Sequence, residues 1–424
     1  MITFTGARKG TAPLTWGQRA IWDAIQRTAP DDHYFNFGRI LETPRGARPA
    51  SIAHVARSVG LLVERHEALR TLIGPGPVQD LRERGELPLR IAVDAEPRAV
   101  LAELSATAFD YAAEWPVRVA FVTSGDEVTH VVLVFCHLAA DGIGAEEVVR
   151  DLRLLLLRGG LGGGPPPQPF DLAEWQASPA GRRQAAGAAA FWEREHRRMP
   201  PTMFHVPSGA AEHPPVWRAT LSSPAADLAA QRLAVRHGTS TSTVVLTAVG
   251  TLVAEVTGHE TVTVLPIVSN RFRATTRTAV TTLSQEGLFV LEAGKSRFTD
   301  LLAASGPAVL RAYRSAYHDP ADRERVVAGA ARERGTPIHP YCCFNDMRFV
   351  EQAVYRDEEL IRRALPETSL SWPLSQDKLN CRFCVHLAGA GQISLTADTR
   401  WLSRPDIERF LLGLERMLVE AALR

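Results

Sequence analysis

The sequence has little net charge of either sign and no long apolar run. Its 48 Lys and Arg residues balance 47 Asp and Glu residues, which leaves a formal net charge of +1. Such a balance supplies no field that would gather nucleic acid or an anionic membrane, so we expect neither as a partner. No segment has about 18 uninterrupted apolar residues, and the N-terminus lacks the apolar stretch of a signal peptide. These absences predict a cytoplasmic protein without a membrane span.

Cysteine is scarce, and its five residues are odd in number. In a long chain this favours reduced thiols over a disulfide framework. Cys381 and Cys384 form a C-x-x-C, the one pattern that invites a metal site, but the adjacent Cys342 and Cys343 are poorly spaced to complete it. In a regular strand, the two C-x-x-C thiols would also point to opposite faces. We therefore predict no metal site.

The chain is too long for a single hydrophobic core. Its 424 residues favour two domains, and both halves mix helix-like and strand-like patterns, which predicts an α/β fold in each. The stretch "RGGLGGGPPPQPF" (158–170) is rich in Gly and Pro, and no Lys-Ser or Lys-Thr pair follows it as in a phosphate-binding loop. It is more typical of a linker. We place the boundary there, between domains 1–165 and 166–424.

Hydrophobic periodicity predicts the elements around the most distinctive motif. Apolar residues recur at helical spacing over 14–28, 51–73 and 145–157, which predicts amphipathic helices. Residues 115–136 are rich in Val and Phe with "SGDE" in the middle, which predicts a β-hairpin. A further strand is expected at 261–271, ending in an Arg. The hairpin delivers the chain to "FCHLAADG".

His137 stands where that strand ends and the next helix begins. Strand ends in α/β proteins often carry the chemistry, and the pKa of histidine suits proton transfer near neutral pH. A hydrogen-bonded structural histidine is the alternative. Asp141 could orient the imidazole, or it could form a buried ion pair, for which Arg271 is the candidate. In the second case Gly142 would supply a backbone conformation that a side chain would strain.

Several segments resemble the condensation domains of nonribosomal peptide synthetases, within the wider chloramphenicol acetyltransferase-like superfamily. "CHLAADG" resembles their H-H-x-x-x-D-G motif. "LTWGQRAIW", "RHEALRT" (65–71) and "PFDLAEWQ" (169–176) are similar to further family motifs, and the stretch ending in "VLPIVSNR" follows the family's helix-strand-Arg pattern. The resemblance runs over nearly the whole chain in the family's order.

The resemblance implies a fold and a reaction. The fold would be two chloramphenicol acetyltransferase-like α/β sandwich subdomains in a V with a central tunnel. The reaction would transfer an acyl group from a carrier-protein phosphopantetheine thioester to an amine, or sometimes to an alcohol. His137 matches the motif histidine beside the reacting groups, as general base or as positioning group, while Asp141 and Arg271 match a structural pair. The resemblance implies no bound cofactor; the phosphopantetheine would come with an acyl or peptidyl carrier protein.

The sequence departs from the family pattern at some positions. Cys136 replaces the first motif histidine; we expect its side chain to point away from His137 into packing, with a nucleophilic role as the alternative. Asn345, in "CCFND", stands where some relatives have a polar tunnel residue, so Cys136 and Asn345 are the substrate-binding candidates. Gly144 stands where relatives often have Ser. The stretch "TTLSQEGLFVLEA" keeps only part of the usual pattern.

Three functional hypotheses remain. Because no adenylation, thioesterase or carrier sequence accompanies the motifs, we expect a free-standing condensation enzyme that forms an amide in natural-product biosynthesis. Ester formation on an alcohol is the second hypothesis. The third is a catalytically degenerate domain that recruits another protein. Retention of His137, Asp141 and Gly142 together favours an enzyme.

Overall fold

The chain divides into two compact α/β units. The computed structural model describes residues 1–44, 50–348, 353–379, 381–389 and 391–424. The first unit contains Met1–Arg183 and Ser269–Ser284, and the second contains Gln184–Val268 and Gln285–Arg424. The predicted boundary between residues 165 and 166 therefore differs from the observed division. The reason is that α5 (Pro169–Ala177) packs on β2 (Gly10–Pro13) of the first unit.

The first unit is built around a four-stranded sheet. Its strands lie in the order β3 (Phe37–Glu42), β9 (Glu127–Phe135), β8 (Val117–Ser124) and β7 (Leu89–Val93). Smaller sheets join β2, β5 (Val78–Leu81) and β4 (Thr71–Gly74), and β1 (Ile2–Thr5) with β6 (Arg84–Leu87). Strands β8 and β9 form the predicted hairpin, and Gly125 turns the chain between them at φ 58°. Its β-branched residues fill a pleated, buried surface.

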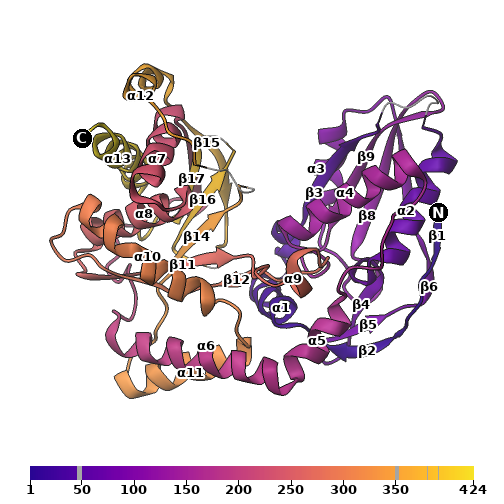
Figure 1. Ribbon diagram of the computed structural model, residues 1–424, viewed down its shortest axis with the longest axis horizontal. Coiled ribbons are helices and arrows are strands. Elements are labelled where there is room, and N and C mark those ends of the chain that lie inside the picture. The colour runs from indigo at the N-terminus through magenta and orange to yellow at the C-terminus, as the bar shows by residue number, and fades with distance from the viewer. Residues whose placement is uncertain (45–49, 349–352, 380, 390) are drawn as a thin grey trace. The chain divides into compact units, whose positions relative to one another are not determined.

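Helices cover both faces of this sheet (Figure 1). Helices α2 (Ile52–Arg65) and α4 (Gly142–Arg158) share one apolar cluster with alternate residues of β9, such as Leu133. Helix α3 (Pro97–Ser105) covers the other face of the sheet. It contacts β3, β8 and β9 through a separate apolar cluster that contains Val132. The predicted helix over 51–73 is too long: it ends at Arg65, because His66 is extended and bonds to Asp151 at 3.1 Å. A 3-10 turn (Glu67–Arg70) then leads into β4.

Side-chain caps determine where the helices of this unit begin. Thr15 accepts a hydrogen bond from the Gln18 amide and completes a capping box before α1 (Trp16–Thr28). Ser51 caps α2, and Asp141 caps α4. Each cap satisfies an amide that has no partner within the helix. The motif aspartate, Asp141, therefore determines where α4 begins.

The second unit has one large sheet. The order of its strands is β12-β11-β14-β16-β17-β10-β15, and β13 pairs with β11. The bounds are β10 (Val216–Ser222), β11 (Thr261–Val268), β12 (Gln285–Glu286), β13 (Phe289–Glu292), β14 (Cys342–Asp346), β15 (Ser369–Gln376), β16 (Phe383–Ala388) and β17 (Gln392–Asp398). The strand predicted over 261–271 stops at Val268, so Arg271 lies beyond it.

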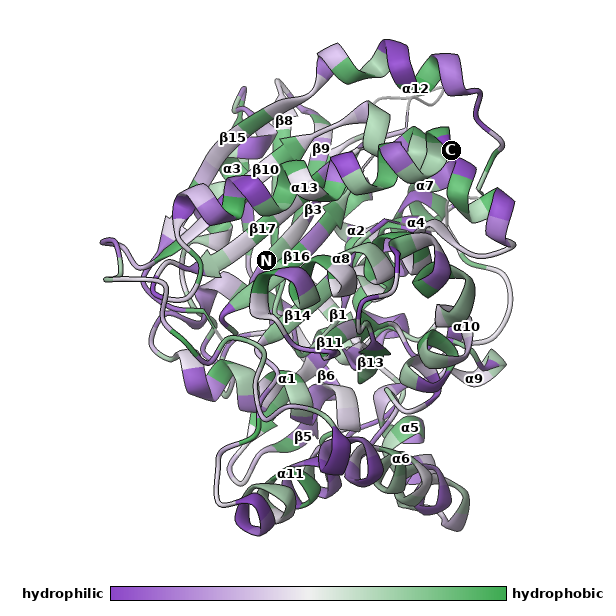
Figure 2. Ribbon diagram, turned by 90° about the vertical axis from the view of Figure 1, so that its left-hand side faces the viewer, coloured by the Kyte–Doolittle hydropathy of each residue, from purple (hydrophilic) through white to green (hydrophobic). Residues whose placement is uncertain are grey.

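Two groups of helices pack in this unit. Helices α7 (Pro224–His237), α8 (Thr241–Thr257), α10 (Phe298–Arg314) and α13 (Arg404–Leu423) share the main core with inward residues of the sheet such as Phe344 and Val385. Helices α6 (Pro179–Arg198) and α11 (Pro320–Arg334) form a second cluster around Trp192. In Figure 2 both show broad hydrophilic bands between apolar ones, the pattern of helices with one buried face. Helix α12 (Glu358–Ala364) lies beside α7.

Within the described ranges, no single helix is long and apolar enough to cross a membrane. Helices α7 and α8 meet the criteria of length and composition only as a pair, across a bend of 106°.

Candidate active site

His137 follows the end of β9 and precedes α4, as the sequence predicts. Strand β9 ends at Phe135 and the chain turns through residues 137–139. The imidazole is half-buried and lies against the Phe37 ring, with 5.2 Å between ring centroids. Burial lowers its pKa, an effect that the carbonyl of His137 itself and the charge of Asp141 only partly oppose. The ring is therefore neutral at neutral pH and able to accept a proton.

Thr282 determines which nitrogen of His137 carries the proton. The Thr282 hydroxyl donates its hydrogen bond to the backbone carbonyl of His137, and Oγ1 lies 3.3 Å from Nδ1. A hydroxyl has one proton to donate, so Oγ1 can only accept at its contact with the ring. Nδ1 must then be the donor, which leaves the lone pair on Nε2. The geometry thus assigns the Nδ1–H tautomer, with Nε2 as the basic atom.

Asp141 is saturated with hydrogen bonds that do not involve His137. Its Oδ1 accepts from Arg271 Nη2 at 2.6 Å and from the Gly144 amide at 2.8 Å. Its Oδ2 accepts from the Leu283 amide at 3.0 Å, and from the amide and hydroxyl of Ser284 at 3.1 and 2.9 Å. Burial alone would raise the pKa of Asp141, but the Arg271 charge and these donors hold it below its usual value. Of the two predicted roles, the structure contains the ion pair.

Arg271 attaches a distant segment to this aspartate. Its side chain is only 5% exposed, and besides Asp141 it donates to the carbonyls of Thr276, Ala279 and Thr281 at 2.6 to 3.2 Å. The guanidinium is therefore surrounded by the carbonyls of the stretch Ser269–Ser284, and its bond to Asp141 holds this stretch against the start of α4. This stretch carries Thr282, so the ion pair positions the residue that contacts His137.

The role predicted for Gly142 is wrong. Gly142 is the first residue of α4 and lies outside the left-handed region of backbone conformation. A Cβ there would meet only Arg39 Nη2, at 3.9 Å. The crowded glycine is Gly144, where a Cβ would lie 3.3 Å from Arg271 Nη2, Asp141 Oδ1 and the Thr281 carbonyl. The constraint in this turn is thus space at residue 144 rather than the conformation of residue 142.

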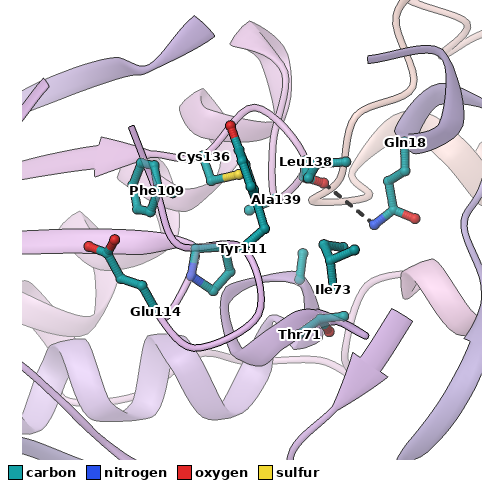
Figure 3. A pocket seen from close by; sticks show the side chains of 11 residues that line it. Gln18, Thr71, Ile73, Phe109, Tyr111, Glu114, Cys136, Leu138 and Ala139 are labelled. Carbon is teal, nitrogen blue, oxygen red and sulfur yellow. Dashed lines mark hydrogen bonds between the residues drawn. The ribbon is translucent and has the colours of Figure 1, made fainter. Parts of the chain in front are cut away.

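Cys136 lies in a different environment from His137. It is 2% exposed and packs in an apolar cluster with Phe109 and Leu138. Figure 3 shows its thiol in a pocket beside Tyr111, where Gln18 Nε2 donates to the Leu138 carbonyl. Burial raises the pKa of Cys136 to about 12, so the thiol stays protonated. This environment opposes the nucleophilic alternative. It agrees with the expectation that Cys136 is a small side chain that packs in the core.

Asn345 belongs to the second unit. It lies on β14, in register with His386 of β16, and is half-buried. Its neighbours Phe344 and Val385 point into the main core, so Asn345 and His386 lie on the opposite face of the sheet. A role in substrate binding stays a prediction.

The motif "RHEALRT" has a structural role. Arg65 Nε donates to Asp151 of α4 at 3.0 Å, and His66 Nε2 lies 3.1 Å from the same carboxylate. Arg70 is 1% exposed and donates to the backbone carbonyls of Arg8 and Arg82. These bonds join α2, α4 and the small sheets, and so hold α4 behind the His137 turn.

The search for site residues in the sequence missed Thr282 and Ser284. Both lie in "TTLSQEG", which keeps only part of a family pattern. The one available signal was the pairing of Asp141 with Arg271, because a bond between residues 130 positions apart must bring the neighbours of Arg271 to the motif.

Solved structures share this fold over almost the whole chain. The condensation domain of the monacolin K polyketide synthase MokA has a TM-score of 0.73 at 15% identity, covering 98% of both chains. SgcC5 from Streptomyces globisporus has a TM-score of 0.70 at 17% identity, covering 97% of this chain and 99% of that one. At such low identity the likeness concerns the fold alone. The fold places the chain in the class of two-subdomain α/β proteins that includes condensation domains.

The family follows from the sequence match. The family model described as "Condensation domain" matches residues 8–291, which is more than half of the chain. The chain therefore belongs to the condensation domain family, which serves nonribosomal peptide and polyketide synthesis. Membership implies acyltransferase-type activity.

Curated relatives are much longer than this chain. The phosphinothricin tripeptide synthetase PhsC of Streptomyces viridochromogenes is 27% identical over 285 residues, 62% of this chain and 26% of the synthetase. The isonitrile lipopeptide synthase of Mycobacterium tuberculosis is 28% identical over 286 residues, 61% of this chain and 11% of the synthase. The chain thus spans about a quarter or less of the curated relatives that it matches.

Proposed function

We propose that this chain is a free-standing condensation enzyme, which transfers an acyl or aminoacyl group from a carrier-protein phosphopantetheine thioester to an amine. The observation that carries the proposal is the contact of His137 with Thr282: Nδ1 lies 3.3 Å from a hydroxyl that donates to the His137 carbonyl, which leaves Nε2 as the basic nitrogen. A cytoplasmic location accompanies this proposal as a prediction. Ester formation and recruitment of another protein are outcomes of the test below.

The proposed step needs little beyond positioning and proton transfer, because a thioester is already activated. The amine nitrogen attacks the thioester carbonyl and forms the C–N bond, while Nε2 of His137 takes the proton that the nitrogen must lose. The tetrahedral intermediate then expels the phosphopantetheine thiolate as the C–S bond breaks, and the imidazolium returns its proton to that sulfur. The cycle consumes neither ATP nor an oxidant.

The test is acyl transfer measured by mass spectrometry. Acyl-pantetheine thioesters, and then acyl groups loaded on carrier proteins, are offered with pooled amines and alcohols to the wild type and to His137→Ala. We expect an acceptor-dependent amide that His137→Ala loses. The matched control is His130→Ala, a histidine within β9, which should keep the activity.

The other outcomes are distinct. A product found only with alcohols would replace amide formation by ester formation. No product from any loaded carrier, by a folded protein that still binds a carrier or another biosynthetic enzyme, would overturn the proposal in favour of recruitment.

A further inference from the structure

One face of the large sheet in the second unit is polar. Ala219 of β10, Leu395 of β17 and Val385 of β16 point into the main core, and in Figure 1 helices α7, α8 and α13 lie on one side of these strands. Because successive side chains of a strand point to opposite faces, the residues that flank these three lie on the other face. They are Arg218 and Thr220, Ser394 and Thr396, and Cys384 and His386, which we call the polar patch.

The strand register brings the polar patch together. Strands β10 and β16 both pair with β17, so each patch residue of β17 lies between a partner on either side. Arg218 Nε donates to Thr396 Oγ1 at 2.7 Å, and the hydroxyl oxygens of Thr220 and Ser394 are 2.9 Å apart. One row of the patch contains Arg218, Thr396 and Cys384, and the next contains Thr220, Ser394 and His386.

Arg218 is a cation without a counter-charge. The residue is half-buried, and burial lowers its pKa. Among the described residues, its Nη atoms have no hydrogen-bond partner and no carboxylate pairs with it. A cation that is partly removed from water is costly unless an anion accompanies it. The polar patch therefore favours an anionic ligand.

The geometry of Arg218 suits a carboxylate. Since Nε is engaged by Thr396, the edge between Nη1 and Nη2 remains, and its two parallel N–H donors match the two oxygens of a carboxylate. His386 adds a buried Nδ1 that has no hydrogen bond to any described residue. Burial above all, and then the Arg218 charge, lower the pKa of His386 to about 4, so its ring is neutral at neutral pH. The patch thus carries one positive charge, which matches a carboxylate better than a doubly charged phosphate.

The thiols of this region do not compete for that role. Cys384 Sγ lies 3.7 Å from His386 Nε2. Cys381 precedes β16, which begins at Phe383, so the strand alternation expected for the C-x-x-C does not extend to it. Within the described ranges, no group of three or more His, Cys, Asp or Glu residues could hold a metal ion. The charge that the patch presents is that of Arg218.

We propose that the polar patch binds the carboxylate of a small-molecule acceptor, with Arg218 as its ion-pair partner. The hydroxyl groups of Thr220 and Ser394 and Nδ1 of His386 are the neighbouring groups that can hydrogen-bond to the rest of the molecule. The inference names the class of acceptor, an amine that also bears a free carboxylate, and for the acceptor role it rests on the proposed function. Binding of the carboxylate itself is measured without acyl transfer.

The test compares acids with their primary amides, which have nearly the same shape but no charge on the carboxyl group. The probes are L-phenylalanine, 4-aminobenzoate and 3-aminopropanoate, each paired with its amide, and saturation-transfer NMR measures their binding to the full-length protein at neutral pH. We expect an acid to bind about 10-fold more tightly than its amide in at least one pair, the size of a charge-assisted hydrogen bond. The absence of a preference in every pair overturns the proposal.

Variants assign the preference to Arg218. Arg218→Gln, shown to be folded by circular dichroism, should bind acid and amide equally. If that variant does not fold, Arg218→Lys carries the test, because an ammonium group cannot form the parallel pair of bonds and acid binding should weaken several-fold. The matched control is Arg416→Gln, an exposed arginine on α13, which should keep the wild-type preference. A folded Arg218→Gln that keeps the preference, or an Arg218→Lys with unchanged affinity, contradicts the proposal.

Acyl transfer to the same pairs separates this proposal from the proposed function. His137→Ala should bind the acids as the wild type does while it loses transfer. Transfer that proceeds as readily to the amides as to the acids would overturn the carboxylate acceptor and leave the acyltransferase intact. Acids that bind through Arg218 but never receive an acyl group would contradict the acceptor role and leave only the carboxylate site.

Discussion

Thr282 and His137 are joined by two hydrogen bonds that together define the tautomer of the histidine. The threonine hydroxyl donates to the His137 carbonyl and accepts from Nδ1 at 3.3 Å. The two residues are 145 positions apart in sequence, and the Asp141–Arg271 ion pair holds the segment that brings them together. The histidine of the proposed reaction thus depends on a threonine that lies outside the motif.

Replacement of Thr282 tests this relationship. Thr282→Val keeps the shape and removes both hydrogen bonds, so Nδ1 loses its acceptor and the Nε2–H tautomer gains population. We expect kcat to fall about 10-fold, equivalent to about 1.4 kcal/mol, with KM little changed. Nitrogen-15 NMR of the His137 ring should report the tautomer directly.

The control for this variant is Thr282→Ser, which keeps the hydroxyl and should retain most of the activity and the Nδ1–H signature. If Thr282→Val keeps the wild-type tautomer while losing activity, the threonine acts through packing alone.

The pH dependence of acyl transfer should report His137. Because burial lowers its pKa below the ordinary value, the neutral base is present at neutral pH and is lost only in more acidic solution. We expect kcat/KM to be flat above about pH 6.5 and to fall below it, with a midpoint under the ordinary histidine pKa of about 6.5. A midpoint above that value would contradict the assignment of His137 as a buried neutral base.

The Asp141–Arg271 pair should dominate the stability of the first unit. Asp141→Asn leaves a buried guanidinium without its counter-charge, which costs about 3–5 kcal/mol in the free energy of unfolding. Urea denaturation measures this loss. The control is Asp80→Asn, which breaks a more exposed pair with Arg82 and should cost about 1 kcal/mol or less. A loss of similar size in both variants would show that the buried pair contributes no more to the free energy of unfolding than the exposed pair does.

The two glycines of the motif turn should respond differently to alanine. Gly142 is at the first helical position with open space around its Cβ site, so Gly142→Ala should keep or slightly raise stability, by up to about 1 kcal/mol. Gly144→Ala places a methyl 3.3 Å from the groups of the ion pair and should lower stability. Thermal unfolding of the two variants, compared with the wild type, measures both effects. The reverse order would contradict the assignment of the crowded position.

His318 should make the stability of the second unit depend on pH. Burial first, and then the charge of Arg323, lower its folded pKa to about 3, while the unfolded value is about 6.5. The unfolded state binds more protons between these values, so the stabilisation is complete above about pH 6.5 and declines as the pH falls toward 3. The depressed carboxyl pKa values of Asp141 and Asp151 act only at lower pH, below about 4.

The expected loss from His318 between pH 7 and pH 5 is about 2 kcal/mol in the free energy of unfolding. Urea titrations at the two pH values measure it. His318→Asn removes the titrating group but not the other buried histidines, so its loss should be smaller by that amount. Equal losses in both proteins would contradict the assignment.

Local pattern was enough to predict the elements that rest on periodicity and capping. The hairpin β8–β9 and helix α4 after His137 follow from a β-branched run and from apolar residues at helical spacing, although α4 begins at Gly142 rather than at residue 145 because Asp141 caps it. The apolar spacing continues past Arg65 and so predicts a longer helix than α2, which ends where His66 makes its buried contact with Asp151. Hydrophobic periodicity carries no information about such a contact between residues far apart in the chain.

The sequence by itself determined the type of fold, the position of His137 at a strand end and the choice of Arg271 as the partner of Asp141, because a buried carboxylate requires a cation. Only the tertiary structure decided that Ser269–Ser284 returns to the first unit and that Thr282 holds the His137 tautomer. Each of these depends on residues far apart in the chain. Their contacts arise from packing and backbone bends, which local spacing does not encode.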